Sequence, residues 1–325
     1  MKTVAILGAT GAVGREMVKI LEERKFPVGT LRLLASEKST GKQIPFRGEL
    51  LPVELAAPEA FRGCDLVLGA AEAEIARRFV GEIQKAGAVF VDNSSAFRLD
   101  SRVPLVVPEV NPEDAKHHLG IIANPNCTTA ITLTALAPLH RKSPVQSLVV
   151  STYQAVSGAG SGGIRELEAQ LSGSEECTVF PYPIARNVIA CIGAPVEEGY
   201  TQEEMKLQNE GRKILHQPGL KVSCTCVRIP VVRCHSISVM ARFLRPVDPE
   251  EARQAIGQAA GCRLVDDMAQ GRYPMPLTAG NQDLVEVGRI RRDLTDANGL
   301  SFWCCGDQLR KGAATNAVQI AELLS

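Results

Sequence analysis

Short apolar runs alternate with segments of helical periodicity along the first 125 residues of the chain. Each run is rich in Val, Ile, Leu and Ala, and several are followed by a segment with a helical pattern, as in residues 15–24. This alternation predicts an α/β fold with a doubly wound parallel sheet of the Rossmann type. The runs that we expect to form its strands are residues 3–7, 31–35, 64–69, 88–91 and 121–123.

The pattern changes near Thr129, where longer insertions separate the predicted strands. This change favours a second, α+β domain, and a chain of 325 residues exceeds the size of most single cores. A periodic segment at residues 309–324 predicts a closing amphipathic helix that returns to the first domain. We therefore expect residues 1–128, completed by 306–325, to form one domain and residues 129–305 the other. The strands expected in the second domain are residues 145–155, 222–229, 236–243, 285–289 and 300–304.

One cysteine lies between a turn set by proline and the start of a predicted helix, in the stretch Asn-Pro-Asn-Cys-Thr-Thr-Ala at residues 124–130. The apolar run before it reads as a buried strand, which Pro125 ends, and the pattern after it is helical. Cys127 is then expected at the positive end of a helix dipole, which favours the nucleophilic thiolate. A buried structural cysteine is the alternative, and the local pattern leaves it open.

A glycine-rich loop follows the first predicted strand directly. Residues 8–14 read Gly-Ala-Thr-Gly-Ala-Val-Gly, and a helical pattern comes next. Gly8, Gly11 and Gly14 permit a tight turn and let backbone amides approach a pyrophosphate held at the start of the helix. The position of the motif between a strand and a helix predicts a dinucleotide site, with a plain structural turn as the alternative.

The loop after the second predicted strand bears on the choice of dinucleotide. An acidic residue ordinarily stands there to hold the ribose 2′-hydroxyl of NAD, but residues 36–42 read Ser-Glu-Lys-Ser-Thr-Gly-Lys. Lys38 and Ser39, with the neighbouring hydroxyls and Lys42, suit a 2′-phosphate, so NADP is favoured over NAD, although Glu37 opposes this. A solvated polar loop is the competing interpretation.

Two further segments carry candidate anion ligands. Arg98 follows a predicted strand of the parallel sheet, and ligands gather at the carboxyl ends of such strands. It is either an anion ligand or a surface arginine. The loop at residues 157–163, Ser-Gly-Ala-Gly-Ser-Gly-Gly, is either a second amide-rich loop for an anion or cofactor, or an ordinary turn between a strand and a helix.

The second domain contains two more groups of polar residues. A helix expected at residues 201–215 begins with a capping signal and has Glu203 and Lys206 on one face, an arrangement that usually gives only a surface salt bridge. Arg228 and His235 lie on a strand-like segment broken by proline. Their spacing alone does not decide whether the histidine is catalytic.

Charge and cysteine content exclude several classes of function. Lys and Arg number 36 against 36 Asp and Glu, so no basic field favours nucleic acid or an anionic membrane. The first apolar run is too short for a signal peptide, and no later run approaches a membrane span. The 10 cysteines include no zinc spacing. Reduced thiols in the cytoplasm and no bound metal are therefore expected.

With these motifs in order, the chain resembles the aspartate-β-semialdehyde dehydrogenase family over essentially its whole length. The separations of Cys127 from Gln154 and of Arg228 from His235 are similar to the family's. The motifs that carry the resemblance are GATGAVGREM, ASEKSTGK, VDNSSAFR with VPLVVPEVNP, NPNCTT, YQAVSGAG, GYTQEEMK, RIPVVRCHS, VGRIRRD and KGAATNAVQIAE.

This resemblance implies the NADPH-dependent reductive dephosphorylation of L-aspartyl-4-phosphate to L-aspartate 4-semialdehyde and phosphate, in the biosynthesis of lysine, threonine and methionine. Cys127 would form a thioester, and Gln154 would orient the acyl group. His235 would be the acid and base, titrating near neutrality. A cytoplasmic homodimer, built through the second domain, is also implied.

The resemblance further implies a set of binding residues. Arg228 would hold the substrate α-carboxylate with its planar fork, and Glu203 would face the substrate amino group. The residues implied for the phosphate are Arg98, Asn126 and Lys206. The residues implied for the cofactor are Gly8, Thr10, Gly11, Ala12, Val13, Lys38, Ser39, Ser157, Gly158 and Gln308.

Three departures from the family pattern bear on the site. The family commonly has Gly-His-Ser-Glu where this chain has Cys234 and Ile237 flanking the His-Ser pair, Gln308 stands where an asparagine is usual, and residues 186–193 differ from the family segment. Two other functions remain as alternatives: N-acetylglutamyl-phosphate reductase and a non-catalytic nucleotide-binding paralogue. The Gln154 motif and Glu203 argue against the first, and the joint presence of the four catalytic and substrate-binding residues argues against the second.

Overall fold

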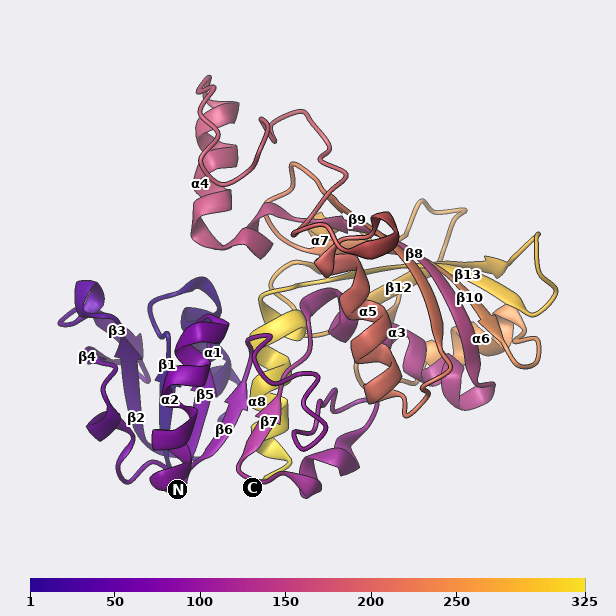
Figure 1. The fold of residues 1–325 in the computed structure, drawn as a ribbon. Coiled ribbons are helices and arrows are strands. Elements are labelled where there is room, and N and C mark those ends of the chain that lie inside the picture. Colours follow the sequence, from indigo (N-terminus) through magenta and orange to yellow (C-terminus); the bar gives the residue numbers. More distant parts are fainter. Residues whose placement is uncertain (325) are drawn as a thin grey trace. The chain divides into compact units, whose positions relative to one another are not determined.

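The chain forms two compact units in a computed structural model that describes residues 1–324 (Figure 1). Unit 1 consists of residues 1–126 together with the chain from residue 313 onward, and unit 2 consists of residues 127–312. Within the described residues, no helix is long and apolar enough to cross a membrane.

Unit 1 is built on a seven-stranded sheet with the strand order β3-β4-β2-β1-β5-β6-β7. All neighbouring strands are parallel except β3 and β4, which pair in antiparallel fashion. The predicted doubly wound parallel sheet is confirmed, with β3 and β4 as additions that we did not predict. The strands are β1 (Lys2–Leu7), β2 (Val28–Ala35), β3 (Gln43–Phe46), β4 (Glu49–Leu55), β5 (Leu66–Gly69), β6 (Val89–Asp92) and β7 (Ile121–Ala123).

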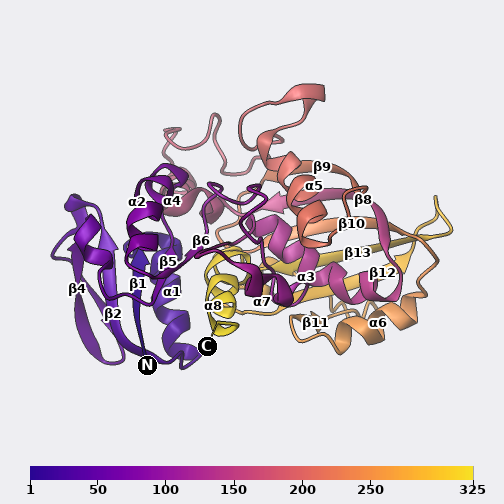
Figure 2. The same ribbon diagram turned by 60° about the horizontal axis from the view of Figure 1, so that its bottom comes forward.

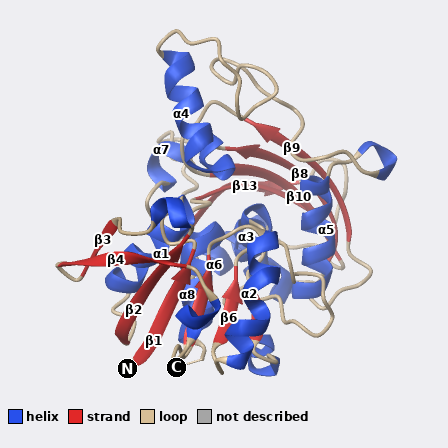
Figure 3. Cartoon of the chain, turned by 60° about the vertical axis from the view of Figure 1, so that its left-hand side comes forward, coloured by secondary structure: helices blue, strands red, loops and turns tan. Residues whose placement is uncertain are grey.

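Side chains of β1 alternate between two apolar cores because successive residues of a strand point to opposite faces of the sheet. Val4 and Ile6 belong to the core that also contains residues of α1 (Ala12–Glu23) and α8 (Thr315–Glu322). Ala5 and Leu7 belong to the core that contains residues of α2 (Ala73–Lys85). Helices therefore cover both faces of the sheet, as Figure 3 shows for α1 and α2.

The C-terminal segment differs from the expected amphipathic helix. A π-helical turn, Arg310–Ala314, precedes α8, and most residues of α8 are buried. The helix lies in unit 1, where Glu322 accepts two hydrogen bonds from the Arg24 guanidinium at 2.7 and 2.8 Å. The helix is mostly buried because it packs against both α1 and the sheet, and its partly exposed residues are Gln319 and Glu322.

Unit 2 contains a six-stranded mixed sheet with the order β11-β12-β13-β10-β8-β9. The pairs β8 with β9 and β11 with β12 are parallel, and the other three pairs are antiparallel. The five expected strands are confirmed, whereas β11 was not predicted. The strands are β8 (Val145–Gln154), β9 (Lys221–Arg228), β10 (His235–Phe243), β11 (Cys262–Leu264), β12 (Val285–Arg292) and β13 (Gly299–Gly306).

Three helices of unit 2 lie on the same side of its sheet, as Figures 1 and 2 show for α3, α5 and α6. α3 packs against α5, α6 and three strands, and its residues 128–139 are all buried. α5 begins with the expected capping box, in which Thr201 and Glu204 exchange side-chain and backbone hydrogen bonds. The helices are α3 (Cys127–Lys142), α4 (Gly160–Leu171), α5 (Gln202–Ile214), α6 (Pro249–Gly257) and α7 (Pro276–Ala279).

Candidate active site

Three of the predicted site residues meet at one end of the unit 2 sheet. Gln154 ends β8 and is the register partner of Arg228, which ends the parallel strand β9. His235 begins β10, which runs antiparallel to β8, so its first residues lie beside the last residues of β8. The topology therefore gathers an amide, a guanidinium and an imidazole that are far apart in the sequence.

Cys127 is the first residue of α3, as predicted. Its side chain is partly exposed, whereas seven other cysteines of the chain are buried. Cys127 is close enough to Arg228 to affect its titration: burial lowers the pKa of the Arg228 guanidinium, while the nearby Cys127 and Glu203 oppose that shift. An accessible thiol at a helix N-terminus, close to a guanidinium, has the surroundings of a reactive cysteine rather than of a purely structural one.

The His235 side chain is fully buried, and its two ring nitrogens have different surroundings. Nδ1 accepts a hydrogen bond from the backbone N–H of Ala155 at 3.0 Å. Nε2 has no hydrogen-bond partner among the described residues. Burial lowers the pKa of His235 to about 3, and the positive charge of Arg228 acts in the same direction. The expectation of a histidine that titrates near neutrality was therefore wrong for the free site.

Arg228 and His235 share one neighbour, Gly158. The Arg228 guanidinium is buried, donates a hydrogen bond to the carbonyl oxygen of Ala155 at 2.8 Å, and lies 5.8 Å from the centre of the Phe180 ring. A Cβ atom on Gly158 would lie 2.8 Å from Nη1 of Arg228 and 3.4 Å from Nε2 of His235. Only glycine leaves both functional groups undisturbed at this point of the predicted loop.

Gln154 connects to a partly buried ion pair on α5, formed by Glu203 and Lys206. The Gln154 amide accepts a hydrogen bond from Thr152 at 2.9 Å and donates one to Glu203 at 3.3 Å. The other oxygen of Glu203 accepts from Lys206 at 2.7 Å. Glu203 is only 8% exposed, so the pair is not the ordinary surface salt bridge that its spacing alone suggests.

The departures at Cys234 and Gln308 are in direct contact. The Gln308 side chain accepts a hydrogen bond from the backbone N–H of Cys234 at 2.9 Å and donates one to Ser157. Cys234 has a φ of 77°, in the left-handed region that favours glycine. This explains why a glycine commonly precedes the histidine in the family pattern. In this chain the Cys234 side chain packs in an apolar cluster with Ala279 and Cys305.

The predicted dinucleotide loop of unit 1 has the geometry that such a site needs. Gly8 has a φ of 91°, and a Cβ atom there would lie 2.7 Å from the carbonyl oxygen of Ala70. A Cβ atom on Gly14 would lie 2.3 Å from the carbonyl oxygen of Gly8. Gly11 precedes α1 without a side-chain cap, so the first N–H groups of the helix can bind an anion placed at its N-terminus.

The loop at residues 36–42 contacts the glycine loop through one residue. Ser39 is buried, and its hydroxyl oxygen accepts a hydrogen bond from the Thr10 hydroxyl at 3.3 Å. Lys38 is exposed beside it, in a 3₁₀ turn at Glu37–Ser39. A fully solvated loop is excluded by the buried Ser39, and the turn presents a cation next to the glycine loop.

Two residues predicted to bind phosphate belong to unit 1. Arg98 is buried and donates hydrogen bonds to the carbonyl oxygens of Asn124, at 2.9 Å, and Asn93, at 2.8 Å. These contacts exclude the alternative of a surface arginine. Asn126 is also buried and directly precedes Cys127 in the chain.

Two residues near the site were not predicted. Asp307 is fully buried and contacts Arg233, at 2.5 Å, and the backbone N–H of Asn281, at 2.8 Å. Gly312 lies against Cys127: a Cβ atom on Gly312 would be 2.8 Å from the Cβ atom of Cys127. In the sequence, Gly312 lies in the KGAATNAVQIAE motif and Asp307 lies shortly before it. The motif does not indicate which residues either of them contacts.

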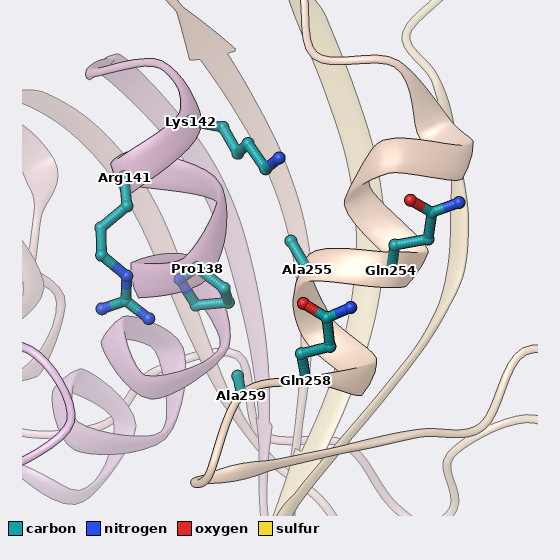
Figure 4. Close-up of a pocket in the computed structure, with 7 residues that line it drawn as sticks. All are labelled: Pro138, Arg141, Lys142, Gln254, Ala255, Gln258 and Ala259. Atoms are coloured by element: carbon teal, nitrogen blue, oxygen red, sulfur yellow. The ribbon is translucent and has the colours of Figure 1, made fainter.

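A pocket of about 340 Å³ lies elsewhere in unit 2, between the last turn of α3 and α6 (Figure 4). Arg141 and Lys142 line it on the α3 side, and Gln254 and Gln258 line it on the α6 side. None of the predicted catalytic, substrate or cofactor residues lines this pocket. The candidate active site is therefore distinct from it.

Comparisons with protein families match both halves of the chain. Residues 3–118 match the family model described as "Semialdehyde dehydrogenase, NAD binding domain". Residues 136–311 match the model described as "Semialdehyde dehydrogenase, dimerisation domain".

Similar proteins match the chain over nearly its full length. A curated aspartate-semialdehyde dehydrogenase of Synechocystis is 50% identical over 99% of this chain and 96% of its own length. The crystal structure of aspartate semialdehyde dehydrogenase II from Vibrio cholerae, complexed with ASA, is 42% identical with a TM-score of 0.97, covering 100% of this chain and 98% of the other. A Candida albicans aspartate semialdehyde dehydrogenase, solved with NADP, is 26% identical with a TM-score of 0.77, covering 100% and 98%.

Proposed function

The chain belongs to the aspartate-semialdehyde dehydrogenase family, and from that premise we propose that it catalyses the NADPH-dependent reductive dephosphorylation of L-aspartyl-4-phosphate. The products are L-aspartate 4-semialdehyde and phosphate, on the route to lysine, threonine and methionine. The observation that carries the proposal is the meeting of Gln154, Arg228 and His235 at one end of the unit 2 sheet, with Cys127 in electrostatic contact with Arg228.

Cys127 is the proposed nucleophile. Its thiolate attacks the acyl carbon, a carbon–sulfur bond forms, and the bond from that carbon to the phosphate oxygen breaks, so phosphate leaves with the electron pair. The N-terminus of α3 favours the anionic sulfur before the attack. The resulting thioester keeps the acyl group on the enzyme while phosphate departs, which divides the reaction into two easier steps.

Arg228 and Glu203 are the proposed recognition pair for the amino-acid end of the substrate. Arg228 already uses one N–H on Ala155, and its remaining donors suit a carboxylate. Its packing over Phe180 and against Gly158 restricts where the fork can point. Glu203 supplies the opposite charge for the substrate amino group, while Gln154, bonded to Glu203, orients the acyl group.

His235 is the proposed donor to the oxygen that becomes negative at the acyl carbon. Because Nδ1 accepts the Ala155 N–H, the proton of the neutral ring lies on Nε2. Nε2 is buried without a partner, so it has a hydrogen bond to give when the oxyanion forms. The oxyanion formed by the attack of Cys127 collapses with loss of phosphate, and the oxyanion that hydride addition to the thioester would form collapses to the aldehyde with loss of the Cys127 thiolate. Both collapses require a donor for the oxygen but no net proton transfer. The histidine acts here as an electrophile.

NADP is the proposed cofactor, and in its reduced form, NADPH, it would supply hydride to the thioester. The tight contacts at Gly8 and Gly14 fit a pyrophosphate loop, and the exposed Lys38 next to Ser39 suits a 2′-phosphate. The proposed contacts in unit 1 are Gly8, Thr10, Gly11, Ala12, Val13, Lys38 and Ser39. Those in unit 2 are Ser157, Gly158 and Gln308.

The departing phosphate is assigned to Arg98, Asn126 and Lys206. Arg98 is held by two backbone carbonyls, which fixes the plane of its guanidinium. Lys206 is about one-third exposed, and its ammonium group forms an ion pair with Glu203. This ion pair fixes the position of the ammonium group, which stays accessible to phosphate. Cations of these two kinds stabilise a leaving phosphate by charge and by hydrogen bonds.

We propose that the protein is a cytoplasmic homodimer paired through unit 2. Residues 1–128 with 306–325 form the proposed domain that provides most of the cofactor contacts and Cys127, and residues 129–305 form the proposed domain that provides Gln154, Arg228 and His235 and the dimerisation surface. The match to a dimerisation domain over residues 136–311 supports the pairing. Exposed large apolar side chains also gather in this unit, for example Tyr182 and Val188. Sedimentation of the purified chain tests the pairing, since a monomer would contradict it.

Steady-state kinetics test the activity. With aspartate semialdehyde and phosphate, the chain should reduce NADP, and it should use NAD less well. A parallel assay in the reductive direction compares aspartyl phosphate with N-acetylglutamyl phosphate. Preference for the second acyl phosphate would favour the reductase alternative, and no turnover with either would favour a non-catalytic protein.

A further inference from the structure

Residues 307–312 contact both sides of the proposed catalytic centre within unit 2. The segment follows β13 and ends in the π-helical turn. Its first two residues hold the chain that leads into β10, and its last residue lies against the start of α3. The segment thus connects the strand that begins with His235 to the helix that begins with Cys127.

The contact on the histidine side consists of charged and neutral hydrogen bonds. The buried Asp307 carboxylate accepts from the Arg233 side chain, and Gln308 accepts from the backbone N–H of Cys234. The donors of these two hydrogen bonds, Arg233 and Cys234, are the two residues that immediately precede His235 in the chain. Cys234 holds a left-handed conformation, which a non-glycine residue keeps only where its surroundings impose it. The Gln308 hydrogen bond is one such constraint.

The contact on the nucleophile side is steric. The Gly312 N–H donates to the carbonyl oxygen of Asp307 at 3.0 Å, five residues back, which is the hydrogen bond of a π turn. A Cβ atom on Gly312 would lie 2.8 Å from Cβ and 3.3 Å from Cα of Cys127, and 3.4 Å from Cβ of Gln308. These atoms belong to or adjoin the backbone, so a side-chain rotation cannot relieve the clash.

We propose that Gly312 is a positioning residue for Cys127, and that the segment 307–312 sets the place of the nucleophile relative to His235. This inference rests on the proposed function. The backbone of the π turn occupies the space beside the first residue of α3, so the missing side chain of Gly312 decides where the Cys127 sulfur lies. Reacting groups displaced by about 1 Å lose much of their rate, on the order of 100-fold.

The test is Gly312→Ala, with Gly257→Ala as the matched control. Both glycines lie in helical turns with negative φ, but a Cβ atom on Gly257 would meet only Leu264, at 4.0 Å. We expect Gly312→Ala to lower kcat by about 10- to 100-fold, with little change in the KM for NADP. We also expect it to alter the rate and the pH profile of Cys127 alkylation by iodoacetamide, with both properties unchanged in the control.

Alkylation does not depend on turnover, so it separates failure of this inference from failure of the proposed function. An alkylation profile for Gly312→Ala that matches the wild type would overturn the inference, whether or not the chain shows dehydrogenase activity. A loss of activity with a normal alkylation profile would also overturn it.

A double variant keeps the inference testable if Gly312→Ala folds poorly. Combining it with Cys127→Gly removes the Cβ atom that the new methyl group meets, so the double variant should unfold at a higher temperature than Gly312→Ala alone. Cys127→Gly by itself serves as the reference for the loss of the sulfur. If the second substitution brings no recovery of the unfolding temperature, the two residues are not in the proposed contact and the inference fails.

Discussion

The backbone N–H of Ala155 donates a hydrogen bond to Nδ1 of His235 at 3.0 Å. This contact decides the tautomer of the ring, because an accepting Nδ1 leaves the proton of the neutral imidazole on Nε2. The two residues are 80 positions apart in the chain and meet because the last residues of β8 lie beside the first residues of β10. The histidine therefore presents a donor to the catalytic centre.

The pH profile of the free enzyme should lack a limb from His235 near pH 6.5. Burial and the Arg228 charge lower its pKa to about 3, so the ring is neutral throughout the neutral and mildly acidic range. Nitrogen-15 NMR of labelled imidazole should show a neutral ring with the proton on Nε2 at about pH 6. A signal of His235 that titrates near its ordinary value would contradict this assignment.

Folding stability should also depend on His235 below neutrality. The unfolded chain binds a proton with the ordinary histidine pKa of about 6.5, whereas the folded site resists it down to about pH 3. Stability is then fully present above pH 6.5 and falls as the pH decreases toward 3, by at most about 1.4 kcal/mol per pH unit.

Urea unfolding of the wild type and of His235→Asn at pH 7.5 and 5.5 measures this effect. The asparagine variant should lose less stability between the two values. His140, whose pKa is also lowered by burial, is present in both proteins and cancels in the comparison. An equal loss in the two proteins would show that His235 protonates in the folded state.

Substitutions at Cys234 should separate backbone strain from side-chain packing. Cys234→Ala loses the buried sulfur and keeps the left-handed conformation of a non-glycine residue, whereas Cys234→Gly loses slightly more volume but removes the strain. We expect the glycine variant to be more stable to urea than the alanine variant by about 1 kcal/mol. If the alanine variant is the more stable one, Cys234 does not carry the strain of a left-handed conformation.

Gly158→Ala should impair substrate binding. The new methyl group would lie 2.8 Å from Nη1 of Arg228 and would displace the proposed ligand of the α-carboxylate. We expect the KM for aspartate semialdehyde to rise by about 10-fold or more, the effect of weakening one charged hydrogen bond by about 1.4 kcal/mol. Gly219→Ala is the control, because a Cβ atom there meets nothing within 4 Å. Equal KM values for aspartate semialdehyde in the two variants would show that Arg228 does not bind the substrate α-carboxylate.

Sequence motifs correctly predicted the turns, helix caps and helix starts, because these features depend on residues that are close together in the chain. Each of three features depends on a few neighbouring residues. They are the strand, glycine loop and helix at the start of the chain, the capping box at Thr201 and the helix start at Cys127. β3 and β4 were missed because Pro45 and Pro52 interrupt their patterns, and prolines are tolerated in such strands mainly near a sheet edge.

Properties of the site that depend on distant residues could not be predicted from the sequence. The low pKa of His235 follows from burial and from Arg228, and its tautomer follows from Ala155. The π turn and the contact of Gly312 with Cys127 follow from packing within unit 2. A motif indicates that such residues belong together, but only the folded chain shows which atoms they contact.

The central claim is that Cys127 carries the acyl group, and a single-turnover experiment without NADPH tests it most directly. Mixing the enzyme with aspartyl phosphate should release phosphate in a burst close to one equivalent per active site and leave an acyl adduct on the peptide that contains Cys127, detected by mass spectrometry. Cys127→Ala should show neither the burst nor the adduct. Phosphate release that requires NADPH, or an adduct on another of the ten cysteines, would contradict the account.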